Sequence, residues 1–343
     1  MARHAVRLAA SHLGPVAEMH SSWVRTYLRG GLSIFIFHDV TDSPSPFQRL
    51  TRSSVSTAVF ERQLDWIGER FEFIDPSWLP QFGGAGELPP NAALISFDDA
   101  WAGIVQTAAP ILARRGLACL WFVNTGTLAG NPDLAVVRTY DAVHGRGGWP
   151  HDVPLSVDAG AQLIAELRGG YVEDHSFESF QGRTATSDDL EAADRLGAVW
   201  FASHLEHHWA LSEIEDALFE LSYKESMKVL QQLTHWLPGL ALPYGGNDRS
   251  LCPGTLELAR EFGCHALFLG RGGANGDPSA LVLDRLWFPP EPASEQAWWW
   301  GVHRARVCRT WASGYSAAPP ALLGDPLSLV ASPSRTMGGN RAP

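Results

Sequence analysis

The stretch Ile95-Ser96-Phe97-Asp98-Asp99 is the most informative part of this chain for both fold and chemistry. Its apolar residues predict a buried strand over 92–97, and that strand ends in two adjacent carboxylates. An ionised side chain removed from water destabilises a fold unless it is paired, hydrogen-bonded or bound to a cation. We therefore expect a compensating group at this strand end, and a metal ion is the simplest one.

A second polar cluster follows about a hundred residues later, in Ser203-His204-Leu205-Glu206-His207-His208. His204 and His208 are four positions apart, so one turn of helix would place both imidazoles on one face. Each cluster alone is a weak signal. Paired aspartates often cap helices, and a chain with 13 histidines places two at this spacing fairly often. Together, at predicted strand ends, they favour a metal site.

Apolar β-rich runs alternate with helix-like stretches along the chain, a pattern typical of a parallel sheet with crossover helices. The acidic and imidazole side chains follow the carboxyl ends of several strands, where barrel-type α/β enzymes place their chemistry. His38, Asp98, Asp99, His204 and His208 could therefore meet at one mouth. The predicted strands are 32–37, 92–97, 118–123, 198–202, 239–243, 265–269 and 281–288. The predicted helices are 56–70, 104–115, 212–221, 224–236 and 255–262.

Three regions depart from this alternation. Residues 1–30 are expected to be an N-terminal extension, and the Pro-, Ser-, Gly- and Ala-rich residues 312–343 a disordered tail. The domain between them, 31–311, has a segment at 124–197 in which the pattern fades. We interpret that segment as an insertion or long loop carrying short elements, and such loops are often functional.

Composition excludes some classes of function. The chain has 343 residues, enough for a substantial core, and 26 basic against 37 acidic residues give a net charge of −11, which argues against a nucleic-acid partner. Its four cysteines form no close pair of metal or redox spacing. Without an integral membrane segment or the uninterrupted apolar core of a signal peptide, the expected location is cytoplasmic.

These motifs together resemble the polysaccharide deacetylases with NodB homology, carbohydrate esterase family four, over 33–289. Ser96-Phe97-Asp98-Asp99-Ala100 resembles the family's Thr-Phe-Asp-Asp-Gly, His204 to His208 its paired histidines, and Leu242-Pro243-Tyr244-Gly245 its third motif. The opening Phe37-His38-Asp39-Val40 is similar to members that act on poly-N-acetylglucosamine and related exopolysaccharides. The resemblance implies an incomplete or distorted (β/α) barrel of about seven parallel strands.

The resemblance also implies a role for each motif residue. Asp99, His204 and His208 would bind a divalent metal, with Zn²⁺ the expected ion. Asp98 would be the general base, and the backbone N–H of Tyr244 would help hold the oxyanion. His38 would be the general acid, although a histidine that ends a buried strand can also be purely structural. The expected substrate is an N-acetylated glycan or its amino-sugar precursor.

Two positions depart from the family pattern. Ala241 stands where an arginine usually orients the base, and Ala100 replaces a glycine. Arg285, on a neighbouring predicted strand, could supply the missing charge. The departure at Ala241 also supports an alternative, a non-catalytic carbohydrate-binding relative, and a further alternative is hydrolysis of a small cyclic or linear amide at the same site. For the aromatic run 298–300 we expect packing against the barrel rather than sugar stacking.

Overall fold

The computed structural model describes residues 31–146, 154–245 and 253–287, and residues 292, 294–295, 297–299 and 301–302. The predicted N-terminal extension, 1–30, and the predicted tail, 312–343, lie outside the described residues. Within the described ranges, every helix is too short or too polar to span a lipid bilayer.

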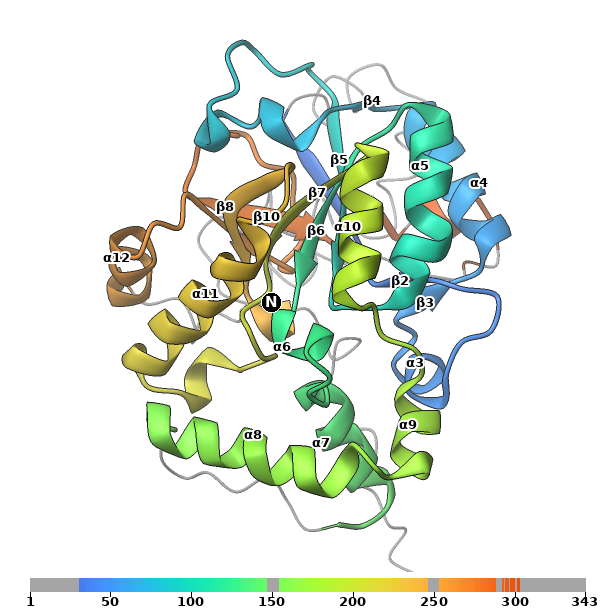
Figure 1. Cartoon of the computed structure of the whole chain (residues 1–343). Coiled ribbons are helices and arrows are strands. Elements are labelled where there is room, and N and C mark those ends of the chain that lie inside the picture. Colours follow the sequence, from blue (N-terminus) through green and yellow to red (C-terminus); the bar gives the residue numbers. More distant parts are fainter. Residues whose placement is uncertain are drawn as a thin grey trace, which may run out of the picture.

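The centre of the fold is a closed barrel of seven parallel strands among the described residues (Figure 1). Closure occurs because β1 pairs with β10 on one side and with β5 on the other. The order around the barrel is β1-β10-β9-β8-β7-β6-β5, which confirms the α/β barrel of about seven parallel strands. The strands are β1 (Ser33–Phe37), β5 (Ala92–Asp98), β6 (Cys119–Val123), β7 (Val199–Ser203), β8 (Trp236–Ala241), β9 (Ala266–Leu269) and β10 (Val282–Leu286).

The barrel strands were predictable because both of their faces are covered. All five residues of β1 and all seven of β5 are buried, so these strands read as nearly continuous apolar runs. Three short strands lie outside the barrel. β4 (Glu72–Phe73) pairs with the start of β5, and β2 (Asp39–Val40) pairs with β3 (Ser54–Val55) just beyond the end of β1.

The helices around the barrel lie largely within the predicted ranges. They are α3 (Pro46–Thr51), α4 (Thr57–Gly68), the π-helix Ile104–Ala108 that continues into α5 (Ala109–Arg115), α11 (Asp216–Leu230) and α12 (Pro253–Glu261). The two helices predicted over 212–221 and 224–236 are wrong: they are replaced by the single helix α11, and Trp236 begins β8. Buried side chains recur along the whole of α11 on one face, so nothing interrupts it.

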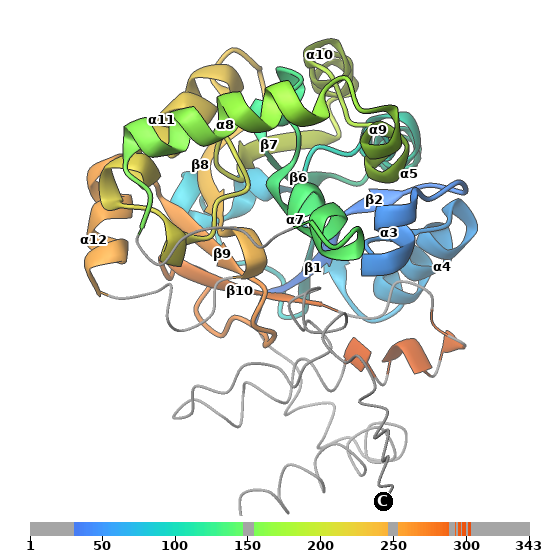
Figure 2. The same ribbon diagram turned by 90° about the horizontal axis from the view of Figure 1, so that it is seen from below.

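The segment 124–197 is mainly helical, so the alternative of a long loop is wrong, while the alternative of an insertion stays a prediction. It forms α6 (Thr125–Leu128), α7 (Leu134–Val143), α8 (Val157–Tyr171), α9 (His175–Gln181) and α10 (Ser187–Leu196). Asp133, Ser156, Asp174 and Thr186 cap four of these helices by accepting backbone N–H groups. In Figures 1 and 2, α7, α8 and α9 lie beyond the carboxyl end of β6, outside the ring of helices around the barrel.

Trp298 and Trp299 pack on the outside of the barrel, as expected. The Trp298 ring is fully buried and stacks 6.2 Å from Phe35 and 5.5 Å from Trp66, measured between ring centroids. The Trp299 ring lies under the guanidinium of Arg70, 3.8 Å from its centroid. The third member of the run, Trp300, lies outside the described residues. The two rings extend the core rather than lining a sugar groove.

Replacing Trp298 should therefore destabilise the fold. We expect Trp298→Ala to lower the free energy of unfolding by about 3–5 kcal/mol, because it removes a fully buried indole and leaves a cavity. Trp78→Ala is the matched control, since that indole is half exposed and its loss should cost much less. Urea denaturation measures both. Equal losses in the two variants would contradict this packing role.

Asp39 is a buried carboxylate in the β2–β3 corner. Gln48 Nε2 donates a hydrogen bond of 2.7 Å to its Oδ2, and burial nevertheless raises its pKa to about 6. A folded-state pKa above the unfolded value means that the folded protein retains a proton that the unfolded chain loses. The contribution of Asp39 to stability therefore falls as pH rises from about 4 to about 6.

Asp39→Asn should remove this pH dependence while keeping an oxygen that accepts from Gln48. We expect the stability of the variant relative to the parent to rise by up to about 3 kcal/mol between pH 4 and pH 6.5. Denaturation curves at several pH values provide the measurement. Parallel stability profiles for parent and variant would show that Asp39 does not titrate in this range.

Candidate metal centre and active site

The two aspartates at the end of β5 point in different directions. Asp98 is the last residue of the strand, and Asp99 turns the chain with a φ of 69°. Few residues other than glycine adopt a positive φ, and aspartate is among those that tolerate it best. Ala100, where the family pattern has glycine, does not have a positive φ, so its side chain introduces no such strain.

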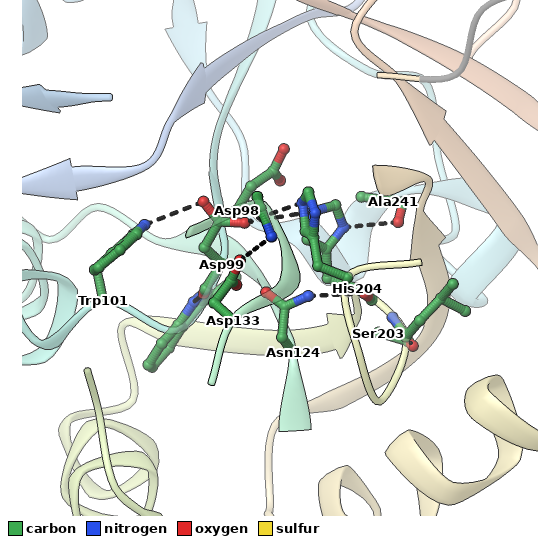
Figure 3. A network of polar contacts seen from close by, with 12 residues as sticks. Asp98, Asp99, Trp101, Asn124, Asp133, Ser203, His204 and Ala241 are labelled. Carbon is green, nitrogen blue, oxygen red and sulfur yellow. Dashed lines mark hydrogen bonds and ion pairs between the residues drawn. The ribbon is translucent and has the colours of Figure 1, made fainter. Parts of the chain in front are cut away.

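Two tryptophans hold Asp99 in position. Trp101 Nε1 donates a hydrogen bond of 3.0 Å to Asp99 Oδ2, and Trp121 Nε1 donates one of 2.5 Å to the backbone oxygen of Asp99. The other carboxylate oxygen, Oδ1, lies 3.6 Å from His204 Nε2 and 3.5 Å from His208 Nε2. Figure 3 shows Asp99 between Trp101 and the imidazole of His204.

The two histidines meet without the helical turn that their spacing predicted. They lie in a loop after β7, in which Leu205 has a φ of 66°. Ser203 Oγ accepts from the Leu205 N–H at 2.9 Å, and the Glu206 N–H donates to α11 at the Ser222 backbone oxygen, 3.0 Å away. The predicted helical turn is therefore wrong. Instead, a loop that reverses its direction at Leu205, held by Ser203 and α11, brings the two imidazole rings to a centroid distance of 4.9 Å.

The hydrogen bond at the far side of the His204 ring fixes its orientation. His204 Nδ1 lies 2.8 Å from the backbone oxygen of Ala241, a group that can only accept, so Nδ1 carries the proton. Nε2 then presents a lone pair toward Asp99. Asn124 Nδ2 donates to the His204 backbone oxygen at 3.1 Å, which ties this residue to the end of β6 (Figure 3).

The group Asp99, His204 and His208 fits a divalent metal ion. One ligand atom from each lies within 4.8 Å of the others, and all three side chains are buried or nearly so. Burial raises the pKa of Asp99 and lowers the pKa of His204 to about 3, which shows how poorly this site tolerates uncompensated charge. A cation would compensate the carboxylate and use the neutral imidazoles as donors, the ligand set typical of zinc.

Asp98 is held by an arginine from β10, which lies on the other side of β1 from β5. Arg285, on β10, donates from Nη1 to Oδ1 at 2.5 Å and from Nη2 to Oδ2 at 2.7 Å. Burial alone would raise the pKa of Asp98, but the charges of Arg285 and His204 outweigh it and lower the pKa to about 2. Through Arg285, β10 thus supplies the charge that Ala241 on β8 lacks.

His38 follows β1 and lies within the electrostatic reach of the same pair. Burial lowers its pKa by disfavouring the imidazolium, while the charge of Asp98 opposes this effect and that of Arg285 adds to it. His38 is partly exposed and lines a small hollow at the surface. The structure thus brings His38 to the same end of the barrel as Asp98 and the metal ligands.

Tyr244 lies beside the metal ligands, in the short turn Pro243–Gly245 after β8. Its φ is 60°, and its ring meets the His208 ring edge to face at a centroid distance of 4.6 Å. The ring is 44% exposed, and the Arg138 guanidinium lies 5.5 Å from its centroid. The role predicted for its backbone N–H stays a prediction.

Three neighbours of the site were not predicted. Trp101 holds Asp99, and the charge of Asp133, the N-cap of α7, acts on Asp99. Arg138 on α7 forms an ion pair with Glu213, in the chain that follows His208. An aspartate before an apolar run does signal a helix start at Asp133, but no local pattern connects that start to the metal ligands.

Removing Arg285 should destabilise the fold, because Asp98 would remain buried without its charged partner. We expect Arg285→Met to lower the free energy of unfolding by about 3–5 kcal/mol, since it leaves a buried carboxylate unpaired. Asp98→Asn combined with Arg285→Met should recover much of that loss. Urea denaturation of the single and double variants in chelator provides the test. A loss below about 1 kcal/mol for Arg285→Met would show that the pair does not hold Asp98.

Comparison of the sequence with protein-family profiles gives no match, and comparison with curated proteins also gives none. Solved structures do match. The deacetylase PplD of Streptococcus pyogenes, solved with acetate, has 16% identity and a TM-score of 0.50, covering 77% of this chain and 94% of its own. IcaB of Ammonifex degensii has 18% identity and a TM-score of 0.51, with coverages of 80% and 98%.

A third match is a de-N-acetylase from Aggregatibacter actinomycetemcomitans, with 15% identity, a TM-score of 0.53, and coverage of 77% of this chain and 97% of its own. These three proteins align with nearly their whole length on this chain, and the structural similarity shows a common fold. The chain therefore has the distorted (β/α) barrel fold of these deacetylases, with a buried Asp-His-His group that could bind a divalent metal at its mouth.

Proposed function

We propose that this protein is a metal-dependent hydrolase that removes N-acetyl groups from an amino-sugar polysaccharide or its precursor. The observation that carries the proposal is the juxtaposition of Asp99, His204 and His208 with a separate carboxylate, Asp98, that is held by Arg285. A structural metal site would not need that second, independently fixed carboxylate. The common fold with solved deacetylases supports the same conclusion.

Asp99, His204 and His208 would hold the ion, with Zn²⁺ the expected one. Bound there, a divalent metal would lower the pKa of a water molecule and polarise the acetamide carbonyl. Three protein ligands leave open positions for these two oxygens. The hydrogen bonds from Trp101 to Asp99 and from His204 to Ala241 would keep the ligands oriented.

Asp98 would accept the proton of the attacking water. Its low pKa keeps it ionised throughout the neutral range, and Arg285 occupies one edge of the carboxylate and so fixes its plane. A carboxylate of low pKa is a weak base, so the transfer depends on how acidic the water becomes. The backbone N–H of Tyr244 would donate a hydrogen bond to the oxyanion that develops on the carbonyl oxygen.

His38 would donate a proton to the leaving nitrogen. The carbon–nitrogen bond then breaks, and the products are acetate and a free amine. The charges of Asp98 and Arg285 act on the pKa of His38, which supports a role for His38 at the same centre. Ala241 in place of an arginine favoured a non-catalytic relative. Because Arg285 supplies the missing charge, this substitution no longer argues against catalysis.

Variants of these residues should separate metal binding from catalysis. Asp98→Asn and His38→Ala should each lower the rate of acetate release from N-acetylglucosamine oligomers by about 10²–10⁴-fold and retain the metal. His204→Ala should lose both metal and activity, and chelator should abolish the parent's activity until Zn²⁺ is restored. Acetate assays and elemental analysis provide the measurements.

Asp188→Asn is the control, because Asp188 is exposed in the first turn of α10 and should leave both readouts unchanged. Failure of the metal-loaded parent to release acetate from any N-acetylated glycan would overturn the proposal. So would an Asp98→Asn variant as active as the parent.

A further inference from the structure

A small hollow of about 20 Å³ opens beside His38, on the face of the barrel that carries the candidate metal ligands. It lies where β1 and β10 end, and where the β2–β3 pair crosses this end of the barrel. Binding sites for drug-sized ligands usually enclose roughly 300–1,000 Å³, so this hollow suits one small group rather than an oligosaccharide. The side chains that matter below are those of His38, Arg52 and Trp287, which all line it.

Arg52 has a backbone conformation that an arginine rarely adopts. It ends α3 with a φ of 55° and a ψ of 39°, at a helix C-terminus where glycine or asparagine is usual. Its own N–H and that of Ser53 both donate to the Gln48 backbone oxygen, which fixes the turn. A residue with a Cβ is less stable than glycine in this conformation, so the arginine side chain is placed here at the expense of stability.

The distribution of such strained residues is informative. Among the described residues, four that are not glycine have a positive φ. Three of them, Asp99, Leu205 and Tyr244, form or adjoin the candidate metal centre, and Arg52 is the fourth. Residues with strained backbone conformations cluster at functional sites, where the surrounding structure holds them in place. The position of Arg52 on a hollow shared with His38 fits this pattern.

The Arg52 guanidinium is available to a ligand. The side chain is exposed, and among the described residues it forms no ion pair or hydrogen bond. Two other arginines at this end of the barrel are already paired, Arg285 with Asp98 and Arg271 with Asp284 at 2.9 Å. Within the described part of the chain, Arg52 therefore presents a cation without a charged partner at the rim of the hollow.

Hydrogen bonds fix the backbone and side chains that line the hollow. Asp39 N–H donates to the Ser53 backbone oxygen at 3.1 Å, and Gln48 Nε2 donates to the buried Asp39 carboxylate at 2.7 Å. Trp287, two residues after Arg285, also lines the hollow and is only partly buried. An indole face packs well against the apolar face of a sugar ring, while a guanidinium pairs with carboxylate or phosphate oxygens in two-point hydrogen bonds.

We infer that this hollow is a subsite for an anionic group, a carboxylate or a phosphate, on the sugar that carries the acetamide or on its neighbour. Arg52 binds the anionic oxygens and Trp287 packs against the ring. The inference rests on the proposed function: His38 protonates the leaving nitrogen, so the sugar that bears this nitrogen lies next to the hollow. The net charge of −11 disfavours a dense polyanion, which indicates a glycan with isolated anionic groups.

The test compares acetate release from three probes of different charge. These are the neutral N-acetylchitotetraose, a tetrasaccharide of alternating glucuronate and N-acetylglucosamine, and N-acetylglucosamine 6-phosphate. We expect Arg52→Gln to lower kcat/KM for a charged probe by about 10- to 100-fold, mainly through KM, and to change the value for the neutral probe by less than about 3-fold. The carboxylate and phosphate arms show which anion is recognised.

Two variants serve as controls. Arg52→Lys keeps the charge but loses the two-point geometry, so it should restore part of the preference for the charged probe. Arg195→Gln removes the same charge from the last turn of α10, next to the start of β7 and so at the other end of the barrel. Arg195 forms only an exposed pair with Glu191, and its loss should leave all three probes unaffected.

Equilibrium binding to Asp98→Asn protein gives a second readout that does not need turnover. A charged probe should bind more tightly than the neutral one by about 10-fold or more, and Arg52→Gln should abolish the difference. Equal effects of Arg52→Gln on charged and neutral probes, or no effect, would overturn the subsite. A binding preference that depends on Arg52, in a parent that releases no acetate, would support the subsite and overturn the deacetylase.

Discussion

The ion pair between Asp98 and Arg285 is the interaction on which the arrangement of this site depends. A carboxylate at the end of a buried strand would be unstable as an ion, and the bidentate contact from β10 stabilises it. The contact requires a closed barrel, because closure places β10 and β5 on either side of β1. Closure of the barrel therefore also provides the charge that keeps Asp98 ionised.

The metal ligands depend on a different constraint, the direction of the backbone after each strand. Asp99, Leu205 and Tyr244 all turn the chain with positive φ, immediately after β5, β7 and β8. These turns point Asp99 away from Asp98, reverse the loop between the two histidines, and set the Tyr244 ring against His208. Tryptophan and backbone hydrogen bonds then fix the ligands, so the site is organised by the protein itself.

Predictions from the sequence were most reliable where one physical requirement dominated. The barrel strands were predictable because burial on both faces demands unbroken apolar runs, and the site residues stood out as polar groups at the ends of those runs. The helices of 124–197 were missed although their capping residues were visible, because helices such as α8 and α10 bury only two residues each and so have few apolar positions to mark them. The helical turn between His204 and His208 was wrong, since spacing alone cannot distinguish a helix from a reversed loop.

By itself, the sequence determined the α/β barrel, the candidate residues of the site and the need to compensate two carboxylates. Tertiary structure decided which partner each of them received. Arg285 reaches Asp98 across 187 positions of sequence, and Asp133 and Arg138 approach the site from one helix, α7, whose pattern gave no sign of it. Such pairings depend on barrel closure and loop direction, which are set by long-range packing and leave no periodic trace in the chain.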